Sequence, residues 1–300
     1  MSEMKFCTLC PRNCKVNREN KTGFCSAPKN AHLAKVMLHQ WEEPCICYGA
    51  GSGALFFSGC QLKCTFCQNH EISQNITGKS LSENDLYDLF FMLEEKGACN
   101  INLVSPTPYF NTLIPSMEKA RAKGLSIPFV LNSGGYESME TLKRLEGLVD
   151  IYLPDFKFFD TALSEKLCRA KDYAEKCIPA LMEMQRQTGN PVFSEEKLQN
   201  GVMIRHLVLP GQTKDSIKIL GKINELFDTD GVVLSLLRQY TPCHLAKEMP
   251  GFNRTLTSLE YQKVEKKAEE IGFTYLYTQK KESAREDFIP DFTVFSREKN

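Results

Sequence analysis

FFSGCQLKCTFCQNHEIS, residues 56–73, places Cys60, Cys64 and Cys67 within eight positions at the spacing C-x3-C-x2-C. Three thiolates on one short loop can hold three irons of a 4Fe-4S cluster, whereas an electron carrier of the ferredoxin type supplies all four ligands. The missing ligand leaves one iron open, and an open coordination position is typical of a catalytic metal site. Zinc is the alternative, with His70 available as a fourth ligand three residues after Cys67.

The sequence around these cysteines alternates β-rich runs with helical segments. A first strand at 53–59 leads directly into the cysteines, and five more strands are expected at 100–106, 128–134, 151–158, 202–210 and 231–240. Helical spacing of apolar residues predicts helices at 82–97, 111–124, 138–147, 164–188, 213–228 and 257–271. Six strand–helix repeats predict an α/β fold with a parallel sheet, arranged as a partial (βα)6 barrel that is open or closed, and residues 273–279 are a possible seventh strand.

The first fifty residues lack this repeat and contain a second group of thiols. We therefore expect a cysteine-rich extension at 1–50 and a barrel domain at 51–300. Cys7, Cys10, Cys14 and Cys25 follow the spacing C-x2-C-x3-C-x10-C, which favours a closed metal site that is structural or relays electrons. Zinc and a second 4Fe-4S cluster both fit this spacing, and four free thiols are the plain alternative. Cys45 and Cys47 are assigned no function.

Composition limits the other possibilities. The 37 basic residues balance 37 acidic ones, so no overall field would recruit nucleic acid, which is an unlikely partner. No apolar stretch approaches the length of a membrane span, and the start lacks a secretory signal, so we expect a cytoplasmic protein with no membrane partner. Thirteen cysteines cannot all be paired as disulfides, and clustered thiols in a reducing compartment indicate metal.

The C-x3-C-x2-C motif after a first strand, with Phe66 just before the third cysteine, resembles the radical S-adenosylmethionine (SAM) superfamily. The stretches GSGALFFSGC (51–60), CQNHEIS (67–73) and CTLCPRNCKVNRENKTGFC (7–25) resemble a narrower group related to pyruvate formate-lyase activating enzymes. The resemblance implies that the unligated iron binds SAM, that an electron from the cluster cleaves its carbon–sulfur bond, and that a 5'-deoxyadenosyl radical abstracts hydrogen from the target.

The resemblance also assigns SAM contacts to the later strand ends. Asn132 and Ser133 resemble a ribose-contacting pair, although NSGG is also an ordinary turn sequence. Asp155 and Lys157 resemble a D-x-K element that meets a SAM carboxylate, with a simple ion pair as the alternative. At the second strand the chain departs from the superfamily pattern, and exposed carbonyls around Ser105 would serve the SAM ammonium instead.

The last two strands carry further candidates. Arg205 lies where related enzymes have a carboxylate-binding or orienting arginine. Gln239 and Tyr240 are candidates for the substrate side, although Tyr240 could be a core aromatic. His206 is a third substrate-side candidate, but alternation along the strand points it away from Arg205 and favours packing.

The resemblance implies an oxidoreductase that takes hydrogen from a glycine of a partner glycyl-radical enzyme, reduced by a donor such as flavodoxin or ferredoxin. The alternative is a radical SAM enzyme acting on a small molecule or an RNA. A plain iron–sulfur electron carrier is disfavoured, because it has no use for six barrel repeats with polar residues at successive strand ends.

Overall fold

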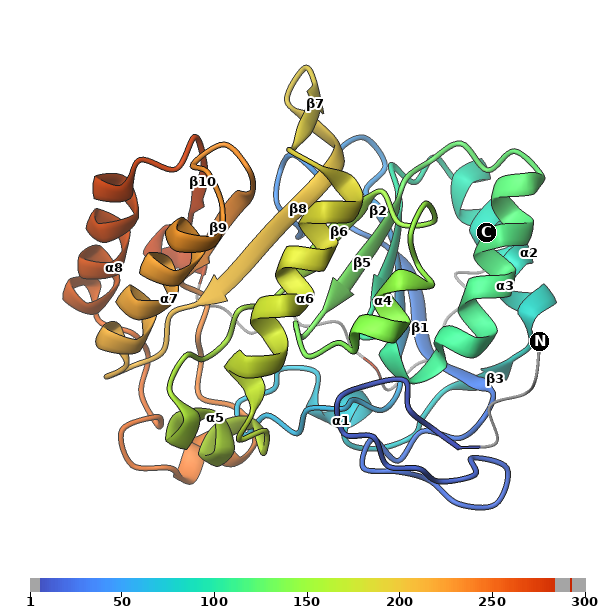
Figure 1. Ribbon diagram of the computed structural model, residues 1–300, viewed down its shortest axis with the longest axis horizontal. Helices are drawn as coiled ribbons and strands as arrows, with labels where there is room; N and C mark the ends of the chain where they lie inside the picture. Colours follow the sequence, from blue (N-terminus) through green and yellow to red (C-terminus); the bar gives the residue numbers. More distant parts are fainter. Residues whose placement is uncertain (1–5, 284–291, 293–300) are drawn as a thin grey trace.

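The computed structural model describes residues 6–283 and residue 292, and its centre is one open sheet (Figure 1). Its parallel strands are adjacent in the order β10-β9-β8-β6-β5-β4-β2. These strands are β2 (Ser52–Phe57), β4 (Ile101–Val104), β5 (Phe129–Ser133), β6 (Ile151–Pro154), β8 (Lys197–Leu207), β9 (Val233–Leu237) and β10 (Tyr275–Thr278). The six predicted strands and the possible seventh are confirmed as parallel, and the sheet does not close into a barrel.

Part of the first fifty residues belongs to this sheet. Strand β1 (Ala31–His39) pairs antiparallel with β2 on one side and with β3 (Lys79–Leu81) on the other. A short strand, β7 (Val192–Ser194), forms a hairpin with the start of β8. The parallel sheet is therefore extended at the β2 side by an antiparallel strand that the search for strand–helix repeats did not detect, and the domain boundary at residue 50 stays a prediction.

Most of the helices cover one face of the sheet, with α3, α4, α6 and α7 in front of it in Figure 1. The helices are α1 (His70–Ser73), α2 (Glu83–Glu95), α3 (Phe110–Ala122), α4 (Met139–Lys143), α5 (Thr161–Cys168), α6 (Tyr173–Thr188), α7 (Thr213–Leu226) and α8 (Ser258–Ile271). Three 3-10 turns are η1 (Thr107–Tyr109), η2 (His244–Glu248) and η3 (Lys281–Ser283). None of the helices in the described part of the chain has the length and apolar character needed to cross a membrane.

Helix α2 shows how the sequence specifies these elements. Ser82 caps its first turn in a capping box with Asp85, which satisfies backbone N–H groups that have no partner inside the helix. The predicted apolar stripe is the buried face: Leu86, Leu89, Phe90 and Leu93. The same face packs toward α3 and the sheet, so capping and periodicity together fix where this helix begins and which side it buries.

The single helix predicted at 164–188 is wrong. The structure has two helices there, because Arg169 adopts a left-handed conformation with φ 56° and ends α5. Helix α6 begins again at Tyr173, whose ring is completely buried. The break places the Tyr173 hydroxyl 2.8 Å from the carbonyl oxygen of Gly134 and 2.7 Å from that of Asp155. It therefore ties together the loops that follow β5 and β6.

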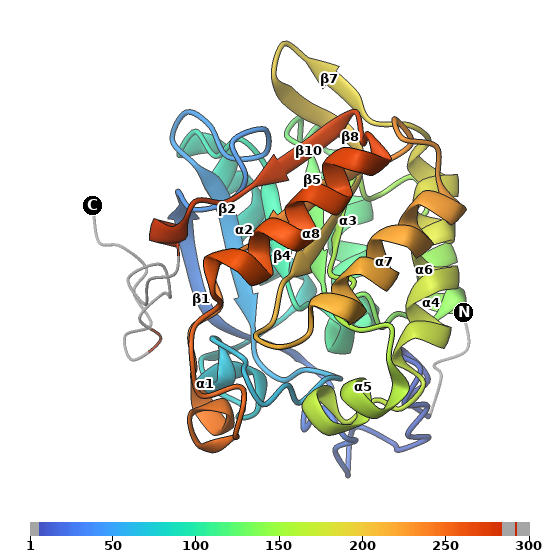
Figure 2. The same ribbon diagram turned by 90° about the vertical axis from the view of Figure 1, so that its left-hand side faces the viewer.

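The carboxyl ends of the parallel strands lie at one edge of the sheet, together with α1, α5 and the N-terminal segment (Figures 1 and 2). Arg12 of that segment donates from Nε to the carbonyl oxygen of Gln61 at 3.0 Å. Leu9 accepts hydrogen bonds at its carbonyl from Thr141 (2.9 Å) and Ser138 (3.3 Å), beside the start of α4. The N-terminal segment is thus docked on the edge where ligands bind in parallel α/β proteins.

We expect Gly135→Ala to destabilise the protein by several kcal/mol more than Gly124→Ala. Both glycines have left-handed φ values, of +73° and +89°, so both substitutions carry backbone strain of about 1 kcal/mol. An added Cβ at Gly135 would lie 2.1 Å from the carbonyl oxygen of Asp155, whereas nothing lies within 4 Å at Gly124. Urea unfolding of both variants measures the difference, and equal losses would show that the loops after β5 and β6 are not in the contact described.

Candidate functional site

Ten residues predicted for the cluster and SAM line one cavity of about 520 Å³. They are Cys60, Cys64, Phe66, Cys67, Ser105, Asn132, Ser133, Asp155, Lys157 and Arg205. The cavity lies at the carboxyl edge and inner face of the sheet, because each of these residues is in or just after one of the strands β2, β4, β5, β6 and β8. A volume of this size is typical of small-molecule sites. The individual roles of these residues stay predictions.

The three cysteines of the loop after β2 are held separately. The backbone N–H of Leu62 donates to Cys60 Sγ at 3.4 Å, and Cys67 Sγ lies 3.3 Å from Ser73 Oγ. Cys64 has Cys168 as its thiol neighbour, and this contact together with burial raises the pKa of the Cys64 thiol. Burial also raises the pKa of Cys60, and it raises that of Cys67 to about 11. Metal binding here would therefore release protons.

The donor set favours a cluster over zinc. Among the described residues, no three His, Cys, Asp or Glu side chains converge on a single metal position. Zinc needs such a position, whereas a four-iron cluster offers each thiolate a separate iron. His70 does not line the cavity: its Nδ1 lies 3.2 Å from the carbonyl oxygen of Cys67, and its ring stacks on His244 at 4.6 Å. The three cavity thiols therefore fit the cluster reading, and His70 is not placed as a fourth zinc ligand.

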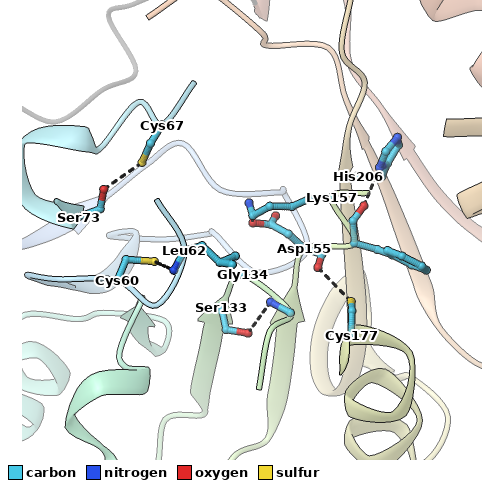
Figure 3. A network of polar contacts seen from close by, with 12 residues as sticks. Cys60, Leu62, Cys67, Ser73, Ser133, Gly134, Asp155, Lys157, Cys177 and His206 are labelled. Carbon is cyan, nitrogen blue, oxygen red and sulfur yellow. Dashed lines mark hydrogen bonds and ion pairs between the residues drawn. The ribbon is translucent and has the colours of Figure 1, made fainter. Parts of the chain in front are cut away.

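Asp155 and Lys157 form an ion pair in the cavity wall. Figure 3 shows the Lys157 side chain extending toward the side where Cys60 and Cys67 lie. Burial alone would lower the pKa of Lys157, but Asp155 and the neighbouring thiols raise it overall, so the ammonium is charged at neutral pH. The backbone N–H of Lys157 donates to the Tyr173 hydroxyl at 3.0 Å, which fixes the loop that carries the pair.

The ends of β4 and β5 bring backbone groups close to the cysteine loop. Ser105 has a left-handed φ of 55°, and its N–H donates to the Asn132 carbonyl at 2.9 Å. This conformation turns the chain sharply where β4 ends. An added Cβ at Gly134 would lie 2.8 Å from Leu62, so the glycine permits the close contact between this strand end and the cysteine loop.

Arg205 is paired with two glutamates that the sequence analysis did not identify. Its guanidinium forms ion pairs with Glu42 and Glu43, and its Nε lies 2.8 Å from Glu43 Oε1. Ser235 donates to Glu43 and Asn102 donates to Glu42, each at 2.8 Å. Although burial opposes ionisation, Arg205 lowers the pKa of Glu43 overall. The guanidinium is thus already paired within the chain, and both predicted roles of Arg205 toward SAM stay predictions.

The substrate-side candidates separate into two kinds. Gln239 and Tyr240 line the cavity, and the Tyr240 hydroxyl donates to the Phe252 carbonyl at 2.7 Å. His206 does not line it and points away from the cysteines in Figure 3. Its Nδ1 lies 2.7 Å from the Phe156 carbonyl oxygen and its Nε2 lies 2.9 Å from Ser216 Oγ. These contacts agree with the packing role that alternation along β8 predicts for His206, whose ring is turned toward α7, rather than with a place on the substrate side.

The four N-terminal cysteines lie near one another but outside the cavity. Burial raises the pKa of Cys10 and of Cys25, and in both cases neighbouring thiols add to the increase. Cys7 is such a neighbour of both, and Cys14 is a neighbour of Cys25. These four thiols are also among the described residues that do not converge on one metal position. A second metal site is therefore not shown.

The buried His206 should make folding sensitive to acid. Burial lowers its pKa from the ordinary 6.5 to about 4, so between these values the unfolded chain binds more protons than the folded one. Stability from this residue is present above pH 6.5 and is lost toward pH 4, by about 3 kcal/mol. We expect His206→Gln to be less stable at pH 7.5 but to lose less on acidification. Urea unfolding at pH 7.5, 6 and 4.5 measures this, and a stability difference that stays constant with pH would refute it.

Comparison with known proteins places this site in a family. Residues 55–222 match the radical SAM superfamily. An uncharacterized protein of Methanocaldococcus jannaschii is 32% identical over 282 residues, which cover 91% of this chain and 77% of that protein.

Two solved structures match this chain at low sequence identity, and the first shares its fold. Streptococcus suis SuiB bound to its precursor peptide SuiA is 13% identical with a TM-score of 0.52, over 79% of this chain and 51% of SuiB. A pyruvate-formate lyase-activating enzyme domain from Bacteroides vulgatus is 13% identical with a TM-score of 0.41, over 57% of this chain and 91% of that domain. The chain spans about half the length of SuiB. From the matched residues, which include all three cavity cysteines, this chain belongs to the radical SAM superfamily and is an enzyme that uses a 4Fe-4S cluster and SAM.

Proposed function

We propose that this enzyme is an oxidoreductase that activates a partner protein by removing a hydrogen atom from one of its glycines. The observation that carries the proposal is the continuous cavity, which extends from the three cysteines to Gln239 and Tyr240. Part of its wall is therefore formed by residues that are not assigned to SAM and could contact a substrate. The stretch CQNHEIS and the N-terminal cysteine motif, both similar to activating enzymes, support the same class of target.

A 4Fe-4S cluster held by the three cavity cysteines would supply the electron that splits SAM into methionine and a 5'-deoxyadenosyl radical. In the proposal, Cys60, Cys64 and Cys67 would hold three irons, and the other cavity residues predicted for SAM would form its site, apart from the wall at Gln239 and Tyr240. Lys157 pairs with the SAM carboxylate, and Asp155 keeps that lysine charged and oriented. The carbonyl groups near Ser105 accept from the ammonium, and the end of β5 contacts the ribose. Phe66 packs beside the loop, with its ring 6.0 Å from that of Phe158.

We further propose that Cys7, Cys10, Cys14 and Cys25 hold zinc or a second 4Fe-4S cluster, of which the cluster agrees better with thiols that do not converge on one position. A flavodoxin or ferredoxin would supply the electron. The proximity of these thiols to one another supports a shared ligand. Their position beside the cysteine loop, through Arg12 and Gln61, supports a role near the path of the electron.

The second candidate is a radical reaction on a small molecule or an RNA. RNA is disfavoured by the balanced charge of the chain. A polypeptide target is favoured by the fold, since SuiB, which shares it, has been crystallised with a precursor peptide. Hydrogen abstraction needs the donor in van der Waals contact with the radical carbon, so the target glycine would enter the cavity on an extended segment.

The cluster assignment predicts a SAM-sensitive electron paramagnetic resonance signal in the reconstituted, reduced protein. Changing Cys60, Cys64 or Cys67 singly to Ala should abolish that response and reduce SAM cleavage by at least about 1000-fold, because each thiolate anchors one iron. Zinc as the only metal retained, or a signal indifferent to SAM, would contradict the assignment. As a control, changing the four N-terminal cysteines together to Ala should lower metal content but preserve a SAM-sensitive signal.

The target assignment predicts deuterium transfer from glycine. The enzyme is incubated without oxygen with SAM, a reductant and candidate glycyl-radical enzymes deuterated at glycine. Deuterium should appear in 5'-deoxyadenosine together with a glycyl radical signal on the partner. If deoxyadenosine forms without deuterium from every candidate but acquires it from a labelled metabolite or RNA, the second candidate replaces the first.

A further inference from the structure

Gln61 follows the cluster ligand Cys60, and its side chain is buried in a fixed hydrogen-bond network. Its amide nitrogen lies 3.0 Å from Glu137 Oε1, 3.0 Å from Thr107 Oγ1 and 3.4 Å from the Tyr136 carbonyl oxygen. Thr107 donates its own hydroxyl proton to Glu137 Oε1 at 2.9 Å, so it must accept from Gln61. All three neighbours of this nitrogen are therefore acceptors, which settles the orientation of the amide.

This orientation directs the amide oxygen of Gln61 toward the cluster ligand. Gln61 Oε1 lies 3.8 Å from Cys60 Sγ, and the Cys60 thiol donates to it. When iron replaces the thiol proton, the negative end of the amide dipole faces a thiolate. Hydrogen bonds and dipoles at cysteine sulfur adjust the reduction potential of iron–sulfur clusters. Added electron density is disfavoured by a facing oxygen, so this amide orientation makes the cluster a stronger reductant.

Glu137 is a buried carboxyl group that contacts Thr107, Ser133 and Gln61, all of which lower its pKa against the effect of burial. Its side chain is 2% exposed, its Oε2 has no hydrogen-bond partner within the described part of the chain, and the ion pairs described there do not include it. Burial raises its pKa to about 8. A buried carboxyl group without a cation is destabilising, and a neutral side chain would fill the space at lower cost. The hydrogen bonds that it makes, including the one that fixes the Gln61 amide, offset that cost.

Gln61 is also held through its main chain, from the N-terminal segment. Arg12 donates from Nε to the Gln61 carbonyl oxygen at 3.0 Å and from Nη2 to that of Cys168 at 3.4 Å. Its guanidinium lies 3.9 Å from the ring centre of Phe24, which orients it. Both the backbone and the side chain of Gln61 are thus fixed by segments outside the cysteine loop.

We propose that Gln61, oriented by Glu137 and Arg12, is a positioning residue that lowers the reduction potential of the cluster by keeping its amide oxygen against Cys60. The inference rests on the cluster assignment and is independent of the glycine target. Because Glu137 Oε1 receives the Thr107 proton, any proton on the carboxyl group is carried by Oε2, and Oε1 stays an acceptor toward Gln61. In Glu137→Gln the introduced N–H2 can occupy that position and donate to Gln61, which would allow the Gln61 amide to turn its own N–H2 toward Cys60 Sγ. The cluster would then be easier to reduce.

The experiment is a redox titration of the reconstituted protein without SAM or target. For Glu137→Gln we expect a more positive midpoint potential, equivalent to about a fivefold larger ratio of reduced to oxidised cluster at a fixed solution potential. Gln61→Leu should shift the potential in the same direction, because it removes the facing oxygen. Arg12→Gln should give a smaller shift. The matched control is Glu183→Gln, a buried glutamate bonded to Arg186 on α6 outside the cavity, which should leave the potential unchanged.

A double variant separates positioning from general damage. If Gln61 transmits the effect, Glu137→Gln should produce no further shift in the Gln61→Leu background, whereas independent effects would add. The proposal is overturned if Glu137→Gln retains wild-type iron content and potential, or if its shift persists in that background. For variants with lower iron content, the midpoint potential is taken from the signal of the protein that retains its cluster. Poor folding is then not mistaken for a redox effect. If the predicted shifts in midpoint potential are observed but no partner glycine is activated, only the target assignment is contradicted.

Discussion

The loop that carries the cluster cysteines has no core of its own and depends on backbone hydrogen bonds from distant parts of the chain. Thr65 donates to the carbonyl of Leu167 at 2.8 Å and accepts from the N–H of Ala246 at 3.0 Å. Arg12 holds the same loop from the N-terminal side. These partners belong to separate segments, so the positions of the thiols are set only when the whole chain is folded. The metal motif is local in sequence, but its geometry is a long-range property of the fold.

This dependence explains what could be predicted from the sequence. Periodicity located the parallel strands because most of them are short, largely apolar runs buried on both faces, as Ile101–Val104 is apart from Asn102. The strand-end polar residues were found for the same reason, since parallel order brings successive carboxyl ends to one edge. The break at Arg169 was missed because a left-handed residue other than glycine has no clear sequence signal. The partners Glu42 and Glu43 were missed because they lie on a connection between antiparallel strands, far in sequence from Arg205.

The two groups of ion pairs in the cavity stabilise different parts of the structure. Asp155 and Lys157 are two residues apart on one loop and neutralise each other, so the lysine stays charged where it faces the cysteines. Glu42 and Glu43 lie on the connection between β1 and β2 and pair with Arg205. This connection starts beside the amino end of β2, because His39 at the end of β1 pairs with Ser52. This second group crosses the inner face of the open sheet and links β1 to β8. An open sheet lacks the hydrogen bonds that close a barrel, and these buried charge pairs connect its two sides instead.

The charge balance of the second group also bears on the cosubstrate. Two carboxylates face one guanidinium, which leaves the inner end of the cavity with an excess negative charge in a buried setting. SAM carries a positive sulfonium and ammonium together with one carboxylate. Lys157 near the cysteines and excess negative charge at the inner end give the cavity both signs of charge, as SAM has, and in the proposed arrangement the lysine would meet the carboxylate. The same field would disfavour an anionic ligand such as a nucleotide phosphate at the inner end. Under the proposed assignment of SAM to this cavity, the acidic pair would contribute to selectivity through its charge, without having to touch the cosubstrate.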